Sequence, residues 1–152
     1  MGCGKGRYLN NLLADRSDIQ FFGVDISRSV VDEKTEHRID WREGSLTNLP
    51  FPDDTFAVTY SCESLEHAVD IESAVREMAR VTKPGGRIVV IDKNAVALGA
   101  LEITPWEQWF DEEGLADIMR PFCCDVSIVH DVDYEDHFQK DLFSVWIGTV
   151  KG

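Results

Sequence analysis

Residues 70–92 read DIESAVREMARVTKPGGRIVVID, and this stretch decides the fold. Asp70 is a good N-cap, and apolar residues recur after it at helical spacing until Pro84-Gly85-Gly86 interrupts the pattern. The apolar run RIVVID follows at once and predicts a buried strand. A helix that leads directly into a buried strand is the repeating unit of an α/β domain.

The flanking sequence continues this alternation in both directions. Upstream, the pattern predicts a helix from the glycines at the start of the chain to about Arg16. Downstream, Thr104, Pro105 and Glu107 have the spacing of a capping box, which predicts a helix over 104–122. The other predicted strands are 19–25, 37–45, 54–61, 125–131 and 143–150.

This order of elements predicts an α/β fold with a doubly wound sheet. Most of its strands are expected to be parallel, and the last two strands are expected to form an antiparallel pair, because no long crossover helix separates them. We expect residues 1–152 to form a single domain. Ligands of such sheets bind at the carboxyl ends of the strands.

Composition restricts the function. The chain has 28 acidic and 15 basic residues, a formal net charge of −13. Because nucleic acids and anionic membranes are bound through Lys and Arg, we expect no general nucleic-acid or membrane-surface binding, and a neutral or cationic small ligand fits better. No apolar stretch reaches the roughly 18 to 20 residues that span a bilayer. The four cysteines lack metal-site spacing, so we expect reduced thiols and a cytoplasmic location.

A glycine-rich segment opens the chain. Gly2, Gly4 and Gly6 precede the first predicted helix, where glycines let backbone N–H groups approach a ligand closely. Asp25 ends the next predicted strand, in a position to accept hydrogen bonds from ribose hydroxyls. These residues alone fit NAD as well as another adenosine ligand. Arg7 stands where the dinucleotide fingerprint has its third glycine, and this disfavours NAD.

Four segments carry a resemblance to a known family. They are GCGKGRYL, FFGVDIS, EGSLTNLPFPDDTFAVTYSCESLEH and EMARVTKPGGRIVVID, within residues 2–92. In this order they resemble class I S-adenosylmethionine-dependent methyltransferases, specifically the small-molecule group with ubiquinone-biosynthesis-like enzymes. The resemblance implies a Rossmann-like methyltransferase sheet, S-adenosylmethionine as cofactor and a small-molecule acceptor. The cofactor-binding residues that it implies are Gly2, Gly4, Gly6, Asp25, Ile26, Ser45, Leu46 and Ser61.

The resemblance also implies a role for each of these residues. The glycines would hold the methionine moiety, Asp25 the ribose hydroxyls and Ile26 the adenine face. Ser45 stands where the family has an acidic residue for the adenine amino group, with the Leu46 backbone N–H beside it, and Ser61 would face the methyl donor. Because a hydroxyl brings no charge, we expect weaker adenine recognition.

The segment ESLEH contains the candidate catalytic residues Glu63, Glu66 and His67. In a helical turn they would share one face, and two carboxylates with an imidazole can hold a divalent cation that activates a bound hydroxyl. The spacing is similar to that of metal-assisted O-methyltransferases. The alternative is that these residues only cap and pack. Lys93 lies near the same place by topology.

Further candidate residues follow the predicted strand RIVVID. Trp106, Trp109 and Phe110 fall where this fold covers the acceptor pocket, and they could contact a planar acceptor or simply pack in the core. His130 and His137 lie near the last two strands and could act as a base or a ligand, or remain in solvent.

The start of the chain departs from the family. There, the glycine loop follows an apolar strand in the middle of the sheet, whereas here Met1 stands where that strand ends. We therefore expect an N-terminally truncated domain with an open sheet position, and such exposed edges favour association of copies. Alternatively, another chain or a rearranged segment fills the position. Two other functions stay open: a noncatalytic methyltransferase-like partner protein and an NAD-dependent oxidoreductase.

Overall fold

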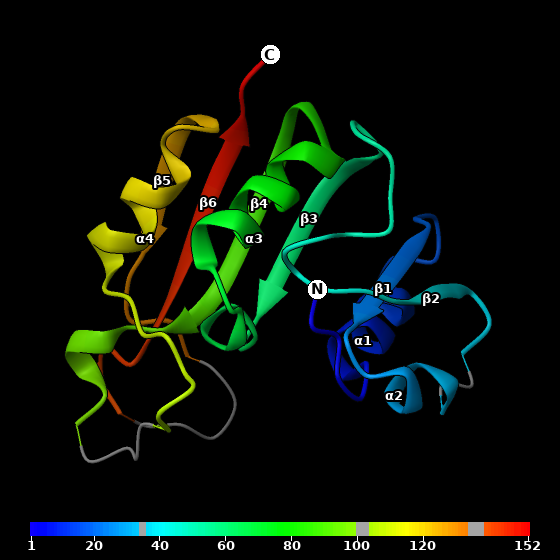
Figure 1. Ribbon diagram of the computed structural model, residues 1–152, viewed down its shortest axis with the longest axis horizontal. Coiled ribbons are helices and arrows are strands. Elements are labelled where there is room, and N and C mark those ends of the chain that lie inside the picture. The colour runs from blue at the N-terminus through cyan, green and yellow to red at the C-terminus, as the bar shows by residue number, and fades with distance from the viewer. Residues whose placement is uncertain (34–35, 100–103, 134–138) are drawn as a thin grey trace.

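A computed structural model describes residues 1–33, 36–99, 104–133 and 139–152 (Figure 1). Helices and strands alternate along the chain. The helices are α1 (Arg7–Asp15), α2 (Arg28–Asp32), α3 (Ile71–Val81) and α4 (Glu112–Met119), with 3₁₀ turns η1 (Leu65–His67) and η2 (Ala95–Ala97). The strands are β1 (Phe21–Asp25), β2 (Ile39–Glu43), β3 (Phe56–Cys62), β4 (Thr82–Lys93), β5 (Cys123–Val129) and β6 (Phe143–Val150).

The strands form two sheets. β1 and β2 pair in parallel, from Phe21 opposite Ile39 to Asp25 opposite Glu43. The larger sheet has the order β3-β4-β6-β5, in which β3 and β4 are parallel and β6 is antiparallel to both of its neighbours. The predicted α/β fold, with parallel strands and an antiparallel pair at the C-terminus, is confirmed.

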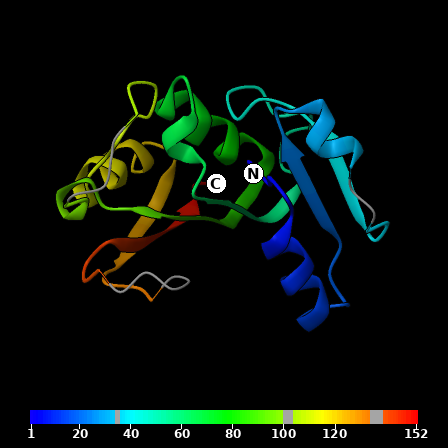
Figure 2. The same ribbon diagram turned by 90° about the horizontal axis from the view of Figure 1, so that it is seen from below.

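Helices cover both faces of the strands. Figure 2 shows α3 and α4 on one side of the larger sheet, while α1 lies on the opposite side next to β1. The side chain of Asp70 accepts a hydrogen bond from the Ser73 amide, so the predicted cap of α3 is present. None of the described helices has the length and apolar character needed to span a bilayer. The main core contains Ala74, Val75, Met78, Leu115, Met119 and Trp146.

The predicted helix over 104–122 is wrong in its first part. Residues 104–110 are not helical, and α4 begins after Asp111, whose carboxylate accepts from the Gly114 amide. The Thr104–Glu107 contact does form, but it closes only one turn. The segment leaves the helical path because Gln108 donates through its backbone to Glu66 and through its side chain to the carbonyls of residues 68 and 69.

β4 begins earlier than predicted. The strand starts directly after α3, and Pro84-Gly85-Gly86 lies inside it instead of forming a separate turn. Thr82 pairs with Phe56, and a register shift follows before regular pairing resumes. A side chain at Gly86 would place its Cβ 2.7 Å from a backbone oxygen of β3, so glycine permits this close approach.

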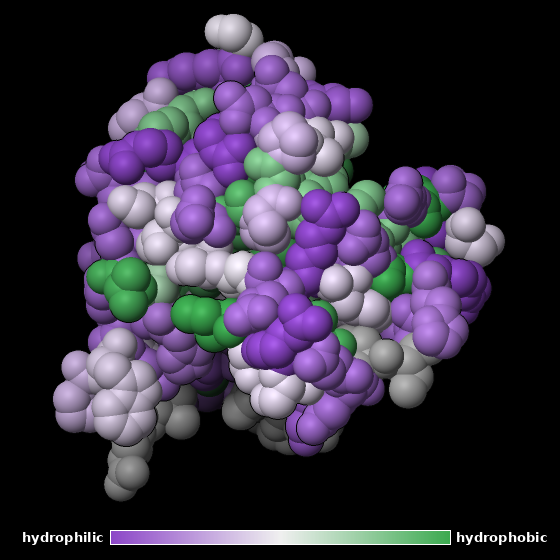
Figure 3. Space-filling view, turned by 45° about the vertical axis from the view of Figure 1, so that its right-hand side comes forward, coloured by the Kyte–Doolittle hydropathy of each residue, from purple (hydrophilic) through white to green (hydrophobic). Residues whose placement is uncertain are grey.

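A gap separates the two sheets. Among the described residues, no strand ladder joins β1 to β3. The N-terminal segment lies between them and forms a hydrogen bond to each: the Met1 amino group donates to the Tyr60 carbonyl of β3 (2.6 Å), and the Cys3 amide donates to the Val24 carbonyl of β1 (2.8 Å). Figure 2 shows the sheets diverging around the N-terminus, and in Figure 3 the surface outline is notched between the two parts. Both inner edges are therefore largely unpaired.

Candidate functional site

A cavity of about 340 Å³ lies at the carboxyl ends of β1 and β3. This is where a doubly wound sheet is expected to bind its ligand. Four segments enclose it: the glycine loop, the end of β1, the connection after β2 and the turn that contains η1. The lining residues are Gly2, Gly4, Asp25, Ile26, Gly44, Ser45, Leu46, Thr47, Glu63, Ser64, His67, Ala68 and Val69.

Asp25 fixes the glycine loop. One carboxylate oxygen accepts from the Gly4 amide (2.8 Å), and the other accepts from the Ser27 amide (3.0 Å). An ionised carboxylate has about four acceptor positions, so Asp25 can still accept from hydroxyls of a ligand. Asp25, which the sequence predicted as a site residue, therefore lines the cavity and also holds the glycine loop in place.

The three loop glycines have backbone conformations that favour glycine, with φ of 59°, 45° and 75° at Gly2, Gly4 and Gly6. At Gly2 an added Cβ would lie 2.4 Å from the Cβ of Ser64, and at Gly6 it would lie 2.6 Å from the ring of Trp41. The loop is thus held tightly at both ends. Gly2 and Gly4 line the cavity, whereas Gly6 is the N-cap of α1 behind it.

The connection after β2 forms the opposite wall. Ser45 hydrogen-bonds Thr47 through the side-chain oxygens (2.9 Å), and Leu46 packs partly into the core. Ile26 extends from the end of β1 with 74% of its surface exposed. These three predicted residues all line the cavity, so an apolar face and a hydroxyl stand on one side of it.

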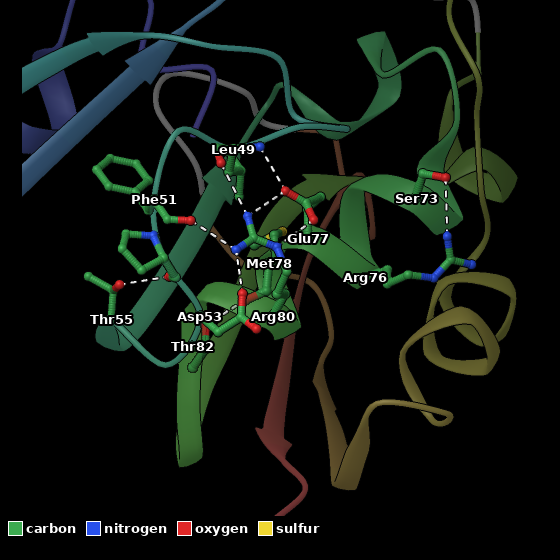
Figure 4. A network of polar contacts seen from close by, with 11 residues as sticks. Leu49, Phe51, Asp53, Thr55, Ser73, Arg76, Glu77, Met78, Arg80 and Thr82 are labelled. Atoms are coloured by element: carbon green, nitrogen blue, oxygen red, sulfur yellow. Dashed lines mark hydrogen bonds and ion pairs between the residues drawn. The ribbon is translucent and has the colours of Figure 1, made fainter.

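Sequence reasoning missed the residues that hold the segment following this wall. Arg80 of α3 donates to the carbonyls of Leu49 and Phe51 and is paired with Glu77 and Asp53 (Figure 4). Glu77 in turn accepts from the Leu49 amide (2.8 Å). The only sequence signal was the helical spacing of Glu77 and Arg80.

Ser61 does not line the cavity. It is fully buried, and its hydroxyl lies 2.6 Å from that of Ser64, which also donates to the Met1 carbonyl. Ser64 occupies the place at the cavity wall that we expected Ser61 to take. Ser61 instead supports the contact between β3 and the glycine loop.

Glu63, Glu66 and His67 point to different partners. The Glu63 carboxylate lies 2.5 Å from the Lys93 ammonium, whereas Glu66 is 2% exposed and its Oε1 is 3.6 Å from His67 Nε2. They diverge because Glu63 has a left-handed backbone (φ 44°) and the 3₁₀ turn starts only at Leu65, so no α-helical face is formed. Among the described residues, no three His, Cys, Asp or Glu side chains are grouped to hold a metal. The predicted cation site therefore does not fit this geometry.

A buried carboxyl lies behind these residues. Asp92 at the end of β4 is fully buried, and burial together with the nearby Glu66 raises the pKa of Asp92 well above the ordinary value of 3.8. The Oδ2 atom of Asp92 and the Oε2 atom of Glu66 are buried without a hydrogen-bond partner among the described residues. Burial opposes the charge of Lys93, but the hydrogen bond that its ammonium donates to Glu63 and the charges of the nearby carboxylates raise the Lys93 pKa. Lys93 is therefore a charged ammonium.

The remaining candidate residues from the sequence lie in different environments. Phe110 is buried edge-on against Trp146, Trp106 is exposed, and Trp109 lies beside the Lys93 ammonium. His130 is exposed and contacts Glu112 away from the cavity. His137 lies outside the described residues.

The fold belongs to the doubly wound α/β class, with a cavity at the carboxyl ends of its strands. A family model described as a methyltransferase domain matches residues 1–90, and the chain belongs to this family. The predicted methyltransferase resemblance is confirmed.

Named relatives agree with this family. The chain is 37% identical over 102 residues to a demethylmenaquinone methyltransferase of Mycolicibacterium paratuberculosis, a match that covers 60% of the chain and 44% of the relative. It is 31% identical over 127 residues to a 2-phytyl-1,4-naphtoquinone methyltransferase of Thermosynechococcus vestitus, which covers 79% of the chain and 55% of the relative. The chain thus spans about half the length of these two curated relatives.

A solved structure supports the fold. The Thermotoga maritima protein described as a SAM-dependent methyltransferase, possible histamine N-methyltransferase, superposes with a TM-score of 0.79 at 21% identity. The alignment covers 98% of this chain and 79% of that one. At this identity the likeness concerns the fold alone.

Proposed function

We propose that the chain binds S-adenosylmethionine in the 340 Å³ cavity and transfers its methyl group to a small-molecule acceptor. The observation that carries the proposal is the convergence of the glycine loop, Asp25 and the 44–47 connection on one cavity. Its volume falls in the range of about 300 to 1,000 Å³ that is usual for small-molecule pockets.

The residues present fit the cofactor. Asp25 keeps acceptor capacity for ribose hydroxyls, Ile26 offers an apolar face to adenine, and Ser45 with the Leu46 backbone stands beside it. The glycine loop supplies close backbone contacts for the methionine end. The bound cofactor supplies an activated sulfonium methyl. The chain's residues then have to hold the acceptor in line and exclude water.

For the acceptor, we propose a hydroxylated aromatic compound. The two relatives named for quinone substrates support this class, and the net charge of −13 disfavours a polyanion. Glu63 and His67 line the cavity and are the residues we propose to contact the acceptor, while Glu66 is buried behind them. Because no metal ligands are grouped in the part of the chain that the structure describes, the proposal includes no divalent cation. A cytoplasmic location is also proposed, since all four cysteines are thiols.

Calorimetric titration with S-adenosylhomocysteine tests the proposal. We expect an affinity on the order of micromolar, lost in Asp25→Ala and weakened in Asp25→Asn, which can still accept from the Gly4 amide. Asp32→Ala is the matched control, because Asp32 forms an exposed ion pair with Arg28 away from the cavity. If S-adenosylhomocysteine does not bind the parent chain, the proposal is wrong and the noncatalytic alternative is favoured.

A further inference from the structure

The Glu63–Lys93 ion pair stands where the carboxyl ends of β3 and β4 meet. Glu63 directly follows β3, and its amide donates to the Ile91 carbonyl of β4 (2.9 Å). Its left-handed backbone is uncommon for a residue other than glycine. This conformation ends the pattern in which successive side chains of β3 point to opposite faces of the sheet. An unfavourable local conformation is thus maintained at a residue that lines the cavity.

Lys93 is held from several sides. Its side chain is 16% exposed, and its ammonium lies 5.7 Å from the ring centre of Trp109 and 5.3 Å from that of Phe143. Aromatic faces attract a cation at such distances. These contacts fix the position of the Lys93 ammonium. Because the ammonium contacts the Glu63 carboxylate, it also holds that carboxylate in place.

The charges around Lys93 are mainly acidic. Besides Glu63, the groups that face it are Glu66 from η1, Asp92 from β4 and Glu107 from the segment before α4. Burial and the nearby Glu66 raise the pKa of Asp92. The charge of Lys93 is compensated by its contact with the Glu63 carboxylate.

The Glu63–Lys93 pair bears on which functional group of the acceptor can face Glu63. Only one Glu63 oxygen is engaged by Lys93, so the carboxylate can still accept a hydrogen bond. We propose that Lys93 is a positioning residue that holds Glu63 at the cavity wall, so that the site selects a neutral acceptor whose hydroxyl donates to Glu63 and rejects one with a carboxylate there. This inference rests on the proposed methyl-transfer function.

A pair of matched probes tests it. The neutral probe is 1,4-dihydroxynaphthalene and the charged probe is 1,4-dihydroxy-2-naphthoate, whose carboxylate neighbours a hydroxyl. Binding is measured by calorimetry under argon, with the protein saturated with S-adenosylhomocysteine. The parent protein is expected to bind the neutral probe at least about tenfold more tightly, because a carboxylate would face the Glu63 charge.

Substitutions then separate positioning from simple packing. Glu63→Gln leaves Lys93 without its main counter-charge, so the preference should reverse toward the carboxylate probe. The double variant Glu63→Gln/Lys93→Met should show no preference. Lys93→Met alone should lower the affinity for the neutral probe about tenfold, and Lys93→Arg should recover part of that affinity. Arg16→Met, which removes an exposed pair with Asp18, is the control for folding.

The outcomes distinguish this inference from the proposed function. If S-adenosylhomocysteine binds but the probe preference is the same in the parent protein and in Glu63→Gln, the inference is wrong and the proposed function stands. The inference is also overturned if the cofactor-bound parent protein binds neither probe. If S-adenosylhomocysteine itself fails to bind, the proposed function fails first.

Discussion

Asp25 combines two tasks in one side chain. Its carboxylate accepts from the amides of Gly4 and Ser27, and it stays on the wall of the cavity. The sequence predicted the ligand contact from the position of Asp25 at a strand end. It did not predict the contact to Gly4, because that hydrogen bond depends on how the loop folds back over β1.

The glycine loop makes the sharpest prediction at the residue scale. Gly6→Ala adds a Cβ at φ 75° that would lie 2.6 Å from Trp41. Gly85→Ala is a matched control, since Gly85 has the same φ and no atom within 4 Å of the added Cβ. We expect Gly85→Ala to lower the free energy of unfolding by about 1 kcal/mol through strain. Gly6→Ala should cost about 1 to 3 kcal/mol more through overpacking.

Urea unfolding of both variants provides the measurement. Equal losses in the two variants would show that Trp41 moves aside without cost, and would contradict the tight packing of the loop against β2.

At the scale of elements, α3 holds the loop that follows the cavity wall. Arg80→Met removes hydrogen bonds to the Leu49 and Phe51 carbonyls and the pairs with Glu77 and Asp53. We expect a loss of about 1.5 to 3 kcal/mol in the free energy of unfolding, because the charged donors leave acceptors unpaired. The affinity for S-adenosylhomocysteine should also fall as the 44–47 connection loosens.

Arg76→Met is the control on the same helix, because Arg76 forms an exposed pair with Glu72. Its cost should stay within about 0.5 kcal/mol in urea unfolding. Comparable losses for both variants would contradict a specific role of Arg80.

The end of β4 gives a prediction about pH. Burial and Glu66 raise the pKa of Asp92 above 3.8, so the folded state keeps a proton that the unfolded chain has lost. The free energy of unfolding should therefore fall as pH rises above about 4, through this group, until the folded-state pKa is reached. Asp92→Asn cannot ionise and should not show this fall, which is at most about 1.4 kcal/mol per pH unit. Parallel curves of parent and variant between pH 4.5 and 8 would contradict the raised pKa.

Several elements followed directly from the sequence. The helix α3, with its Asp70 cap and apolar face, and the strands β3 and β6 agree with the periodicity of the chain. The start of α4 was misplaced because Gln108 forms tertiary hydrogen bonds that no local pattern reveals. Ser61 was expected at the cavity, but Ser64 lines it instead, because the Ser61 side chain is buried against Ser64, and this contact is also not revealed by a local pattern.

At the scale of the molecule, the two sheets face each other across open edges. In the described structure no strand ladder joins β1 to β3. Hydrogen bonds of Met1 and Cys3 tie the N-terminal segment to the two strands, and the rings of Phe22 in β1 and Phe56 in β3 pack edge-on with their centres 5.1 Å apart. Unpaired strand edges exchange their amide hydrogens rapidly and can pair with another chain.

We predict that the unpaired edges of β1 and β3 promote association of copies of the chain. Light scattering should show a mass above that of the 17.2 kDa chain as concentration rises. Amide exchange in the β1 and β3 edges should slow in the associated form. A monomer at every concentration, with fast exchange at both edges, would contradict this prediction.

The most direct test of the central claim is an amide-resolved NMR titration with S-adenosylhomocysteine. Binding in the cavity predicts shifts at Gly2, Gly4 and Leu46, with Val126 and Thr149 on the distant β5–β6 pair unchanged. Shifts confined to other regions, or none at saturating ligand, would contradict the assignment of this cavity as the cofactor site.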